Sequence, residues 1–180
     1  MAWMRLLLIT SLAFGISACQ SIIPKASGLS QSNWSAWSHS NYQRQDQVDV
    51  QWRKQSFSFL LYQQQQGQVL ELVALSLTGQ QLFQVDYDGQ QIQVKQRIEQ
   101  MRLLPFEFVV RDILLATYPN FAEQQHTAIH TQPMKNGQDI YIKQQLVLKI
   151  RSLEQHIELD NVQVPYQMTF SPIENTLQPN

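Results

Sequence analysis

The chain has 180 residues, and its 13 lysine and arginine residues nearly balance its 14 aspartate and glutamate residues. This length suits one domain with a single hydrophobic core. A near-neutral chain lacks the basic surface that attracts the phosphate backbone of nucleic acid, so nucleic acid is excluded as a partner.

The first 18 residues have the pattern of an export signal. Arg5 and the amino terminus supply positive charge, and an apolar run continues from Leu6 to Ala18. This run of about 13 residues is shorter than the roughly 20 that a permanent membrane span needs. We therefore expect residues 1–18 to be removed during export.

The end of this segment, Ile16, Ser17, Ala18 and Cys19, resembles the lipobox of bacterial lipoproteins. The alternative is an ordinary export signal followed by a chance cysteine. The resemblance implies that Cys19 is acylated and anchors the protein to a membrane. Gln20 stands where lipoproteins of the inner membrane usually have aspartate, which implies an outer-membrane position facing the periplasm.

The mature chain divides into a tether and a domain. Residues 19–45 are rich in serine, asparagine and glutamine, and we expect them to form an acylated tether. Trp34 and Trp37 in this tether dock on the domain or lie at the lipid interface. We expect a single β-rich domain over residues 46–172 and a tail over residues 173–180. The 30 glutamines of the chain are interpreted as surface residues without a function.

Residues 47–96 alternate apolar and polar side chains with the period of half-buried antiparallel strands. The Asp88-Gly89 dipeptide predicts a two-residue hairpin turn. A second turn is expected over Thr78 to Gln80. These turns define three predicted pairs and one shared apolar face: Tyr87 with Gln90, Val85 with Ile92, Phe83 with Val94, and Val73, Leu75 and Leu77 on the face of Phe83 and Val85.

Pro105 and Pro119 delimit a predicted helix of three to four turns. Its apolar residues cover a broad sector, so the helix should be buried. Glu107 and Arg111 are expected to form an ion pair on the other side. Asp112 lies at the edge of the apolar sector, where it either bonds backbone N–H groups or faces a cavity mouth.

Strands resume after the helix. Residues 127–134 are expected to be extended, and Asn136-Gly137 predicts another hairpin turn. Further strands are predicted from alternating apolar residues: Ile140, Ile142, Leu146, Leu148, Ile150, Ile157, Leu159, Tyr166, Met168 and Phe170. The predicted fold class is α+β, with an antiparallel sheet curled into an unclosed β-barrel around one apolar helix.

This order of elements, with residues 104–119 (LPFEFVVRDILLATYP) and 157–170 (IELDNVQVPYQMTF), resembles the LolA/LolB-like superfamily of outer-membrane lipoproteins. More narrowly, it resembles the lipoproteins encoded with aryl-polyene biosynthesis genes. The resemblance implies an apolar cavity for acyl chains under a helical lid. One difference is the polar segment 63–68, where LolB-type proteins are similar to each other in exposing an apolar residue that inserts into the membrane.

The apolar inner face of the predicted sheet and the helix supply the candidate ligand-binding residues. They are Phe59, Leu61, Val73, Leu75, Phe83, Val85, Ile92, Val109, Val110, Ile113 and Leu114. No catalytic residues and no cofactor are expected. His126 and His130 are four residues apart, but they lie in an expected extended segment without further ligands, so no metal site is expected either.

Two functions remain open from the sequence. The protein either binds a hydrophobic lipid, of acyl or aryl-polyene type, in an apolar cavity, or it is a non-catalytic scaffold whose packed domain docks an envelope protein. An enzyme is not expected, because Asp112 and His126 are the best acid–base pair that the chain offers. The expected partners are the membrane, through Cys19, and either a lipid or an envelope protein.

Overall fold

The computed structural model describes residues 41–89, 91–124 and 129–173. The predicted signal, the tether up to residue 40, Cys19, Trp34, Trp37 and His126 lie outside the described residues. The first strand begins at Gln43, so residues 43–45 are part of the sheet and not of the tether.

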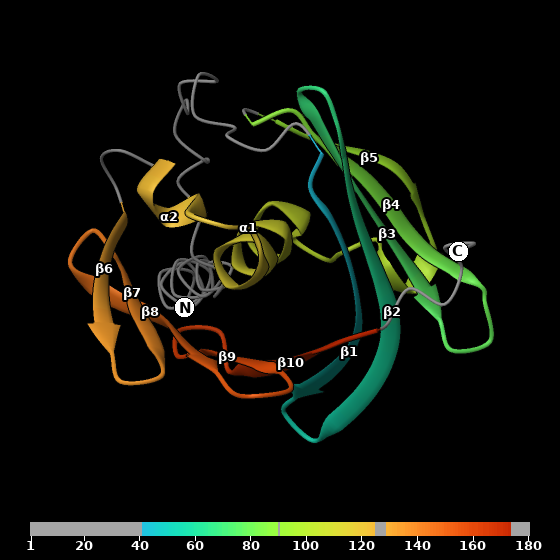
Figure 1. Cartoon of the computed structure of the whole chain (residues 1–180). Helices are drawn as coiled ribbons and strands as arrows, with labels where there is room; N and C mark the ends of the chain where they lie inside the picture. The colour runs from blue at the N-terminus through green and yellow to red at the C-terminus, as the bar shows by residue number, and fades with distance from the viewer. Residues whose placement is uncertain (1–40, 90, 125–128, 174–180) are drawn as a thin grey trace, which may run out of the picture.

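Ten antiparallel strands form one sheet that curls around a helix (Figure 1). Their order is β5-β4-β3-β2-β1-β10-β9-β8-β7-β6, so β5 and β6 are the two edges and the sheet is not closed. The strands are β1 (Gln43–Trp52), β2 (Gln55–Gln66), β3 (Val69–Ser76), β4 (Gln81–Tyr87), β5 (Ile92–Arg97), β6 (Ile129–Met134), β7 (Gly137–Ile142), β8 (Gln145–Ser152), β9 (Ile157–Asn161) and β10 (Tyr166–Pro172). The predicted antiparallel, unclosed sheet is confirmed.

The helix α1 (Phe106–Thr117) lies on the concave side of the sheet (Figure 1). It begins after Pro105, and Tyr118 before Pro119 is already extended, as the two prolines predict. The described residues also include a short helix α2 (Phe121–Gln124) and a single 3₁₀ turn η2 (Glu99–Met101). The expectation of one helix was therefore incomplete.

The predicted register of β3 against β4 was wrong by one residue. Leu72 lies opposite Val85 and Ala74 opposite Phe83, so Leu70, Leu72 and Ala74 form the buried inner face. A register shift between Ala74 and Leu75 accommodates the longer turn before β4. Because side chains alternate between the two faces, Val73, Leu75 and Leu77 do not share the face of Phe83 and Val85.

The hairpin between β4 and β5 was also predicted with the wrong register. Tyr87 pairs with Ile92 and Val85 with Val94, so the loop has four residues and not two. Gly89 has the positive φ of 84° that the prediction required, and the Gln91 N–H donates to Asp88 Oδ1 at 2.7 Å. This shift of two residues keeps Ile92 and Val94 on their predicted face, but a register shift between Gln84 and Val85 places Arg97 opposite Phe83, where Val94 was predicted. Val94 is nevertheless exposed, because β5 is an edge strand.

Two turns differ from the prediction: one was not predicted, and the other lies one residue earlier than predicted. Residues 140–150, expected as a single alternating run, bend at Lys143 and Gln144, whose φ angles of 51° and 65° suit a tight hairpin. The β6–β7 hairpin closes with Met134 opposite Gly137, so Gly137 begins a strand instead of forming the turn. A Cβ atom at Gly137 would lie 2.1 Å from the Ile150 carbonyl oxygen, so glycine is required there for close approach.

Candidate functional site

The helix α1 presents two different sides to the sheet. At 100° per residue, Phe106, Val110 and Thr117 lie within about 40° of one another around the helix, and Asp112 and Ala116 lie about 120° away from them. Phe106 packs edge-on against Phe83 of β4, with ring centroids 5.2 Å apart, and Thr117 contacts β2. Asp112 contacts β9 and β10. The helix therefore joins the two halves of the sheet.

The space between α1 and strands β1–β4 is filled with side chains. Leu61, Val85 and Val110 have no exposed surface. Of the expected ligand-binding residues, the following belong to or pack against one core cluster: Phe59, Leu61, Phe83, Val85, Ile92, Val109, Val110, Ile113 and Leu114. Val73 and Leu75 lie outside it, because they are on the outer face of β3. The residues expected to line a cavity therefore form a packed core.

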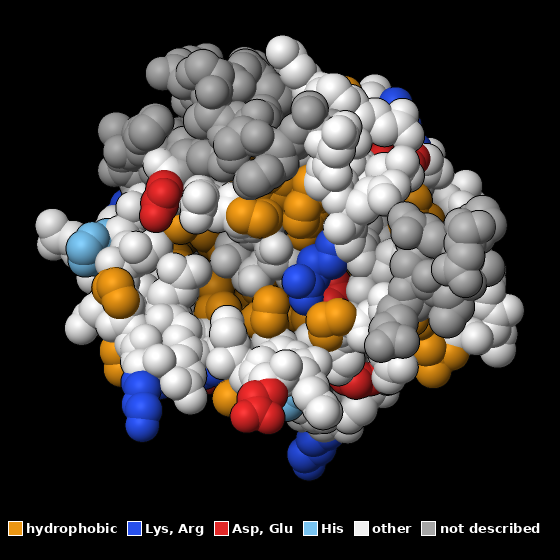
Figure 2. All heavy atoms as spheres, viewed as in Figure 1, with side chains coloured by type: hydrophobic (Ala, Val, Ile, Leu, Met, Phe, Trp, Pro, Cys, Tyr) orange, Lys and Arg blue, Asp and Glu red, His pale blue; other side chains and the backbone are white. Residues whose placement is uncertain are grey.

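A second part of the interior is more open. Figure 2 shows a hollow on the face in view, with hydrophobic side chains gathered around it. We use the name inner hollow for the space on the concave side between α1 and strands β6–β9. Ile129 of β6 and Ile142 of β7 are paired on the inner face and only partly buried, and so is Ala116 of α1. Apolar surface thus remains accessible there.

Asp112 is the centre of a buried polar cluster. A structural role for Asp112 was one of the two alternatives predicted, but its partners were not. Its Oδ1 accepts from Arg111 Nε at 2.9 Å and Nη2 at 2.6 Å. Its Oδ2 accepts from Asn161 Nδ2 at 2.7 Å and from the Tyr166 hydroxyl. Asp112 has no exposed surface, and both of its oxygens are used by side chains rather than by backbone N–H groups. Burial is the main cause that raises the pKa of Tyr166.

Arg111 departs from its predicted role. It pairs with Asp112 instead of Glu107, and its guanidinium carbon lies 4.5 Å from the ring centre of Phe108. Arg111 is buried, whereas Glu107 is exposed. The cluster of Arg111, Asp112, Asn161 and Tyr166, which we call the Asp112 clamp, fastens α1 to β9 and β10. A buried carboxylate that accepts four hydrogen bonds is well ordered.

A second polar cluster lies at the end of α1 that points towards β1 and β2. Tyr42 donates to the Thr117 carbonyl oxygen at 3.1 Å, and Tyr118 donates to Gln65 Oε1 at 2.7 Å. The two tyrosine rings are 4.6 Å apart. Burial raises the pKa of Tyr42 and that of Tyr118 to about 12.

Gln63 belongs to the same cluster but is incompletely bonded. It is 1% exposed, and its Oε1 lies 3.1 Å from Thr117 Oγ1. Its Nε2 is the one buried side-chain nitrogen or oxygen without a hydrogen-bond partner in the part of the chain that the structure describes. Such an atom loses its bonds to water without replacement, which disfavours folding by about 1–3 kcal/mol.

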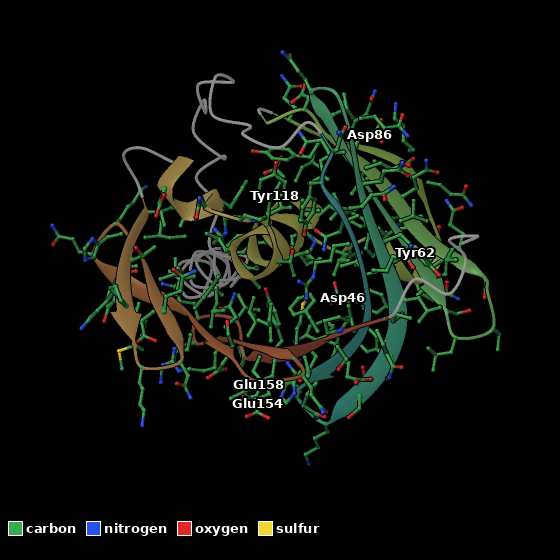
Figure 3. All side chains as sticks on the ribbon, viewed as in Figure 1. Asp46, Tyr62, Asp86, Tyr118, Glu154 and Glu158 are labelled. Carbon is green, nitrogen blue, oxygen red and sulfur yellow. The ribbon has the colours of Figure 1, made fainter. Side chains whose placement is uncertain are left out.

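An ion pair stands beside Gln63. Arg44 is its direct partner across β1 and β2, and the Arg44 Nε and Nη2 atoms each lie 2.7 Å from an oxygen of Asp46. The Asp46 side chain is 0% exposed and that of Arg44 is 22% exposed. Figure 3 shows Asp46 inside the curl, between α1 and β1, and Figure 2 shows a basic and an acidic side chain next to each other in the same region.

The alternation of inward-facing residues in β1 and β2 extends to Arg44, Asp46 and Gln63, although none of them was predicted as a site residue. Arg44 and Asp46 share the two-residue period of Val48 and Val50, so they continue the inner face of β1. Gln63 likewise continues the inner face of Leu61, although residues 63–66 were expected in a polar loop. These residues belong to strand β2. A charged or amide side chain at an inward-facing position of a strand is therefore a candidate site residue, even when its residue type is common on the surface.

Of the two histidines considered as metal ligands, His130 lies within the described residues and His126 does not. His130 is exposed on β6, and its ring is tilted against that of Tyr141, with ring centroids 6.2 Å apart. Within residues 41–89, 91–124 and 129–173 there is no group of three His, Cys, Asp or Glu side chains placed to hold a metal ion. In the same ranges, no helix has both the length and the apolar character needed to cross a membrane.

Two comparisons with known proteins bear on identity. A search of curated proteins finds no match. One family model matches residues 43–174, from the first residue of β1 to two residues beyond β10. This match covers most of the chain and the whole described sheet. The chain therefore belongs to the family described as "Protein of unknown function (DUF3261)".

Proposed function

We propose that this protein is an outer-membrane lipoprotein that binds a hydrophobic lipid, of acyl or aryl-polyene type, in the inner hollow. The observation that carries the proposal is the partly exposed apolar surface of Ile129, Ile142 and Ala116 on the concave side of the sheet. Apolar concave sites suit ligands with long hydrocarbon chains.

The topology supplies a route for such a ligand. Because β5 and β6 do not pair, the curled sheet is not closed, and we expect a chain-like molecule to reach the concave side between these two edge strands. The Asp112 clamp holds α1 against β9 and β10, so the helix defines one wall of the inner hollow. A curled sheet with a buried helix also agrees with the LolB-like resemblance of the sequence.

The binding test compares two strands with matched substitutions. Ile142→Trp places a large ring in the inner hollow, whereas Val73→Trp places it on the outer face of β3. We expect a soluble form without residues 1–19 to bind a fluorescent acyl lipid with saturation. Ile142→Trp should weaken this binding at least about tenfold, and Val73→Trp should leave it unchanged. Absence of saturable binding in the unsubstituted domain would exclude the proposal.

A docking role is the second candidate. Exposed apolar side chains support it, above all Leu103, which is 83% exposed in the segment before α1. Exposed apolar surface of this kind marks protein-binding sites when it is contiguous. If the soluble domain binds no lipid, Leu103→Ser should disrupt the association with an envelope protein while leaving the melting temperature unchanged.

The anchor is a separate part of the proposal. Cys19 is the sole cysteine of the chain, so it is the one residue that can take a thioether-linked lipid. Cys19→Ser should leave the precursor uncleaved by the lipoprotein signal peptidase and abolish metabolic labelling with palmitate. Normal cleavage and release of a soluble protein would instead indicate an ordinary export signal.

A further inference from the structure

The two buried glutamines of β2 differ in one respect that points to a ligand. Gln65 is 4% exposed and fully engaged: its Nε2 donates to the Gly67 carbonyl oxygen at 3.1 Å and its Oε1 accepts from Tyr118. Gln63, two residues earlier on the same face, leaves Nε2 without a partner. A neighbouring residue of the same type therefore shows what a purely structural glutamine looks like here.

Gln63 lies beside two side chains, Thr117 and Arg44, whose hydrogen-bonding groups are not fully matched. The Thr117 hydroxyl has one proton but two acceptors within reach, the Ile113 carbonyl oxygen at 2.8 Å and Gln63 Oε1 at 3.1 Å. Arg44 uses Nε and one Nη2 hydrogen for Asp46, which leaves the end of the guanidinium available to a second acceptor. Gln63 Nε2 and the end of the Arg44 guanidinium are therefore donors without an acceptor among the described residues, and Gln63 Oε1 competes with the Ile113 carbonyl oxygen for the Thr117 proton.

From these contacts we propose that Gln63, Thr117 and Arg44 form the binding site for the head group of the lipid, and that this head group is neutral and carries a hydroxyl. This inference rests on the proposed lipid-binding function. A hydroxyl is the simplest group that both accepts from Gln63 Nε2 and donates to an oxygen that Thr117 leaves unpaired.

The charge of the site selects a neutral group over an anion. Asp46 neutralises Arg44 at 2.7 Å and is wholly buried. A second carboxylate at the free end of Arg44 would face the Asp46 charge in a poorly solvated place, which disfavours the anion. A glycerol or sugar-alcohol ester has the hydroxyls and no charge.

The position of the site fits a chain that enters the inner hollow. Arg44 lies on the concave side of β1, and β1 pairs with β10, which leads to β9 and the inner hollow. Gln63 Nε2 is buried and has no solvent-accessible opening beside it. A head group must therefore displace a neighbour, and Arg44, whose side chain is 22% exposed, is the neighbour that we expect to move.

The test compares a monoacylglycerol with the methyl ester of the same fatty acid, which keeps the acyl chain and lacks the hydroxyls. The mature protein should bind the monoacylglycerol about fivefold to tenfold more tightly, the effect of one added hydrogen bond. The fatty-acid anion should bind more weakly than the monoacylglycerol at neutral pH.

Two variants separate a head-group role from a structural one. Gln63→Leu should abolish the preference for the monoacylglycerol, leave the methyl ester affinity unchanged and not lower the melting temperature. Gln65→Leu should lower the melting temperature and keep the preference. Equal affinities for both lipids in the unsubstituted protein would overturn the head-group site while leaving lipid binding intact. Failure to bind either lipid would overturn both proposals.

Discussion

The helix α1 makes two polar contacts with the sheet, and they differ in how many of their buried polar atoms are hydrogen-bonded. Towards β9 and β10, the Asp112 clamp uses every oxygen of the carboxylate, and Asn161 Oδ1 accepts from two further backbone N–H groups. Towards β1 and β2, Gln63 keeps an unpaired amide nitrogen. A fully matched buried network orders a fold, whereas an incompletely matched one retains binding capacity. We therefore interpret the first contact as structural and the second as functional.

The largest expected effect is at the Asp112 clamp. Asp112→Leu leaves the buried Arg111 without its counter-ion, so the free energy of unfolding should fall by about 3–5 kcal/mol. Urea unfolding followed by circular dichroism measures this loss. Glu107→Ala, on the exposed side of the same helix, should change the value by less than about 0.5 kcal/mol. Similar values for both variants would mean that the clamp does not hold α1.

The next effect tests the corrected register of β3. Leu72 is wholly buried on the inner face, whereas Leu75 is partly exposed on the outer face. Leu72→Ala should destabilise the domain by about 2–5 kcal/mol, and Leu75→Ala by about 1 kcal/mol. Thermal or urea unfolding of both variants provides the comparison. A larger loss for Leu75→Ala would support the register predicted from the sequence.

The smallest effect at neutral pH concerns the functional end of α1. Tyr42→Phe removes one hydrogen bond to Thr117, which should lower the free energy of unfolding by about 0.5–1.5 kcal/mol. Because the pKa of Tyr42 rises from 10.0 to about 12 on folding, the stability from its neutral form is present below pH 10 and lost between pH 10 and about 12. The advantage of Tyr42 over phenylalanine should therefore shrink and reverse across that interval. A constant difference would contradict the buried position of the hydroxyl.

Local patterns predicted the elements better than their connections. Two prolines delimited α1 correctly, since proline restricts both its own backbone and that of the preceding residue. The predicted pairings of β4 with β3 and with β5 were wrong. A register shift in β3 and a four-residue loop before β5 change which residues face each other, and neither is visible in the alternation of apolar and polar residues. Lys143 and Gln144 form a tight turn without the usual glycine or asparagine, so tertiary pairing and not local preference sets that bend.

The candidate site was less predictable than the fold. Apolar residues chosen by face were mostly placed inside, but an apolar side chain packs against a neighbour as readily as it lines a hollow, and the sequence does not distinguish the two. Asp112 was noticed because a charge within an apolar helix is unusual. Gln63 was assigned no function because glutamine is abundant in this chain, and its missing partner is visible only in three dimensions.

The most direct test of the central claim is to locate a bound lipid on the protein. A diazirine-bearing acyl lipid, crosslinked by light to the mature protein and mapped by peptide mass spectrometry, reports which residues the chain contacts. Our account predicts labelling around Ala116, Ile129 and Ile142 that excess unlabelled lipid removes. Labelling confined to the outer face around Val73 and Leu75, or labelling that excess lipid does not reduce, would contradict a lipid site in the inner hollow.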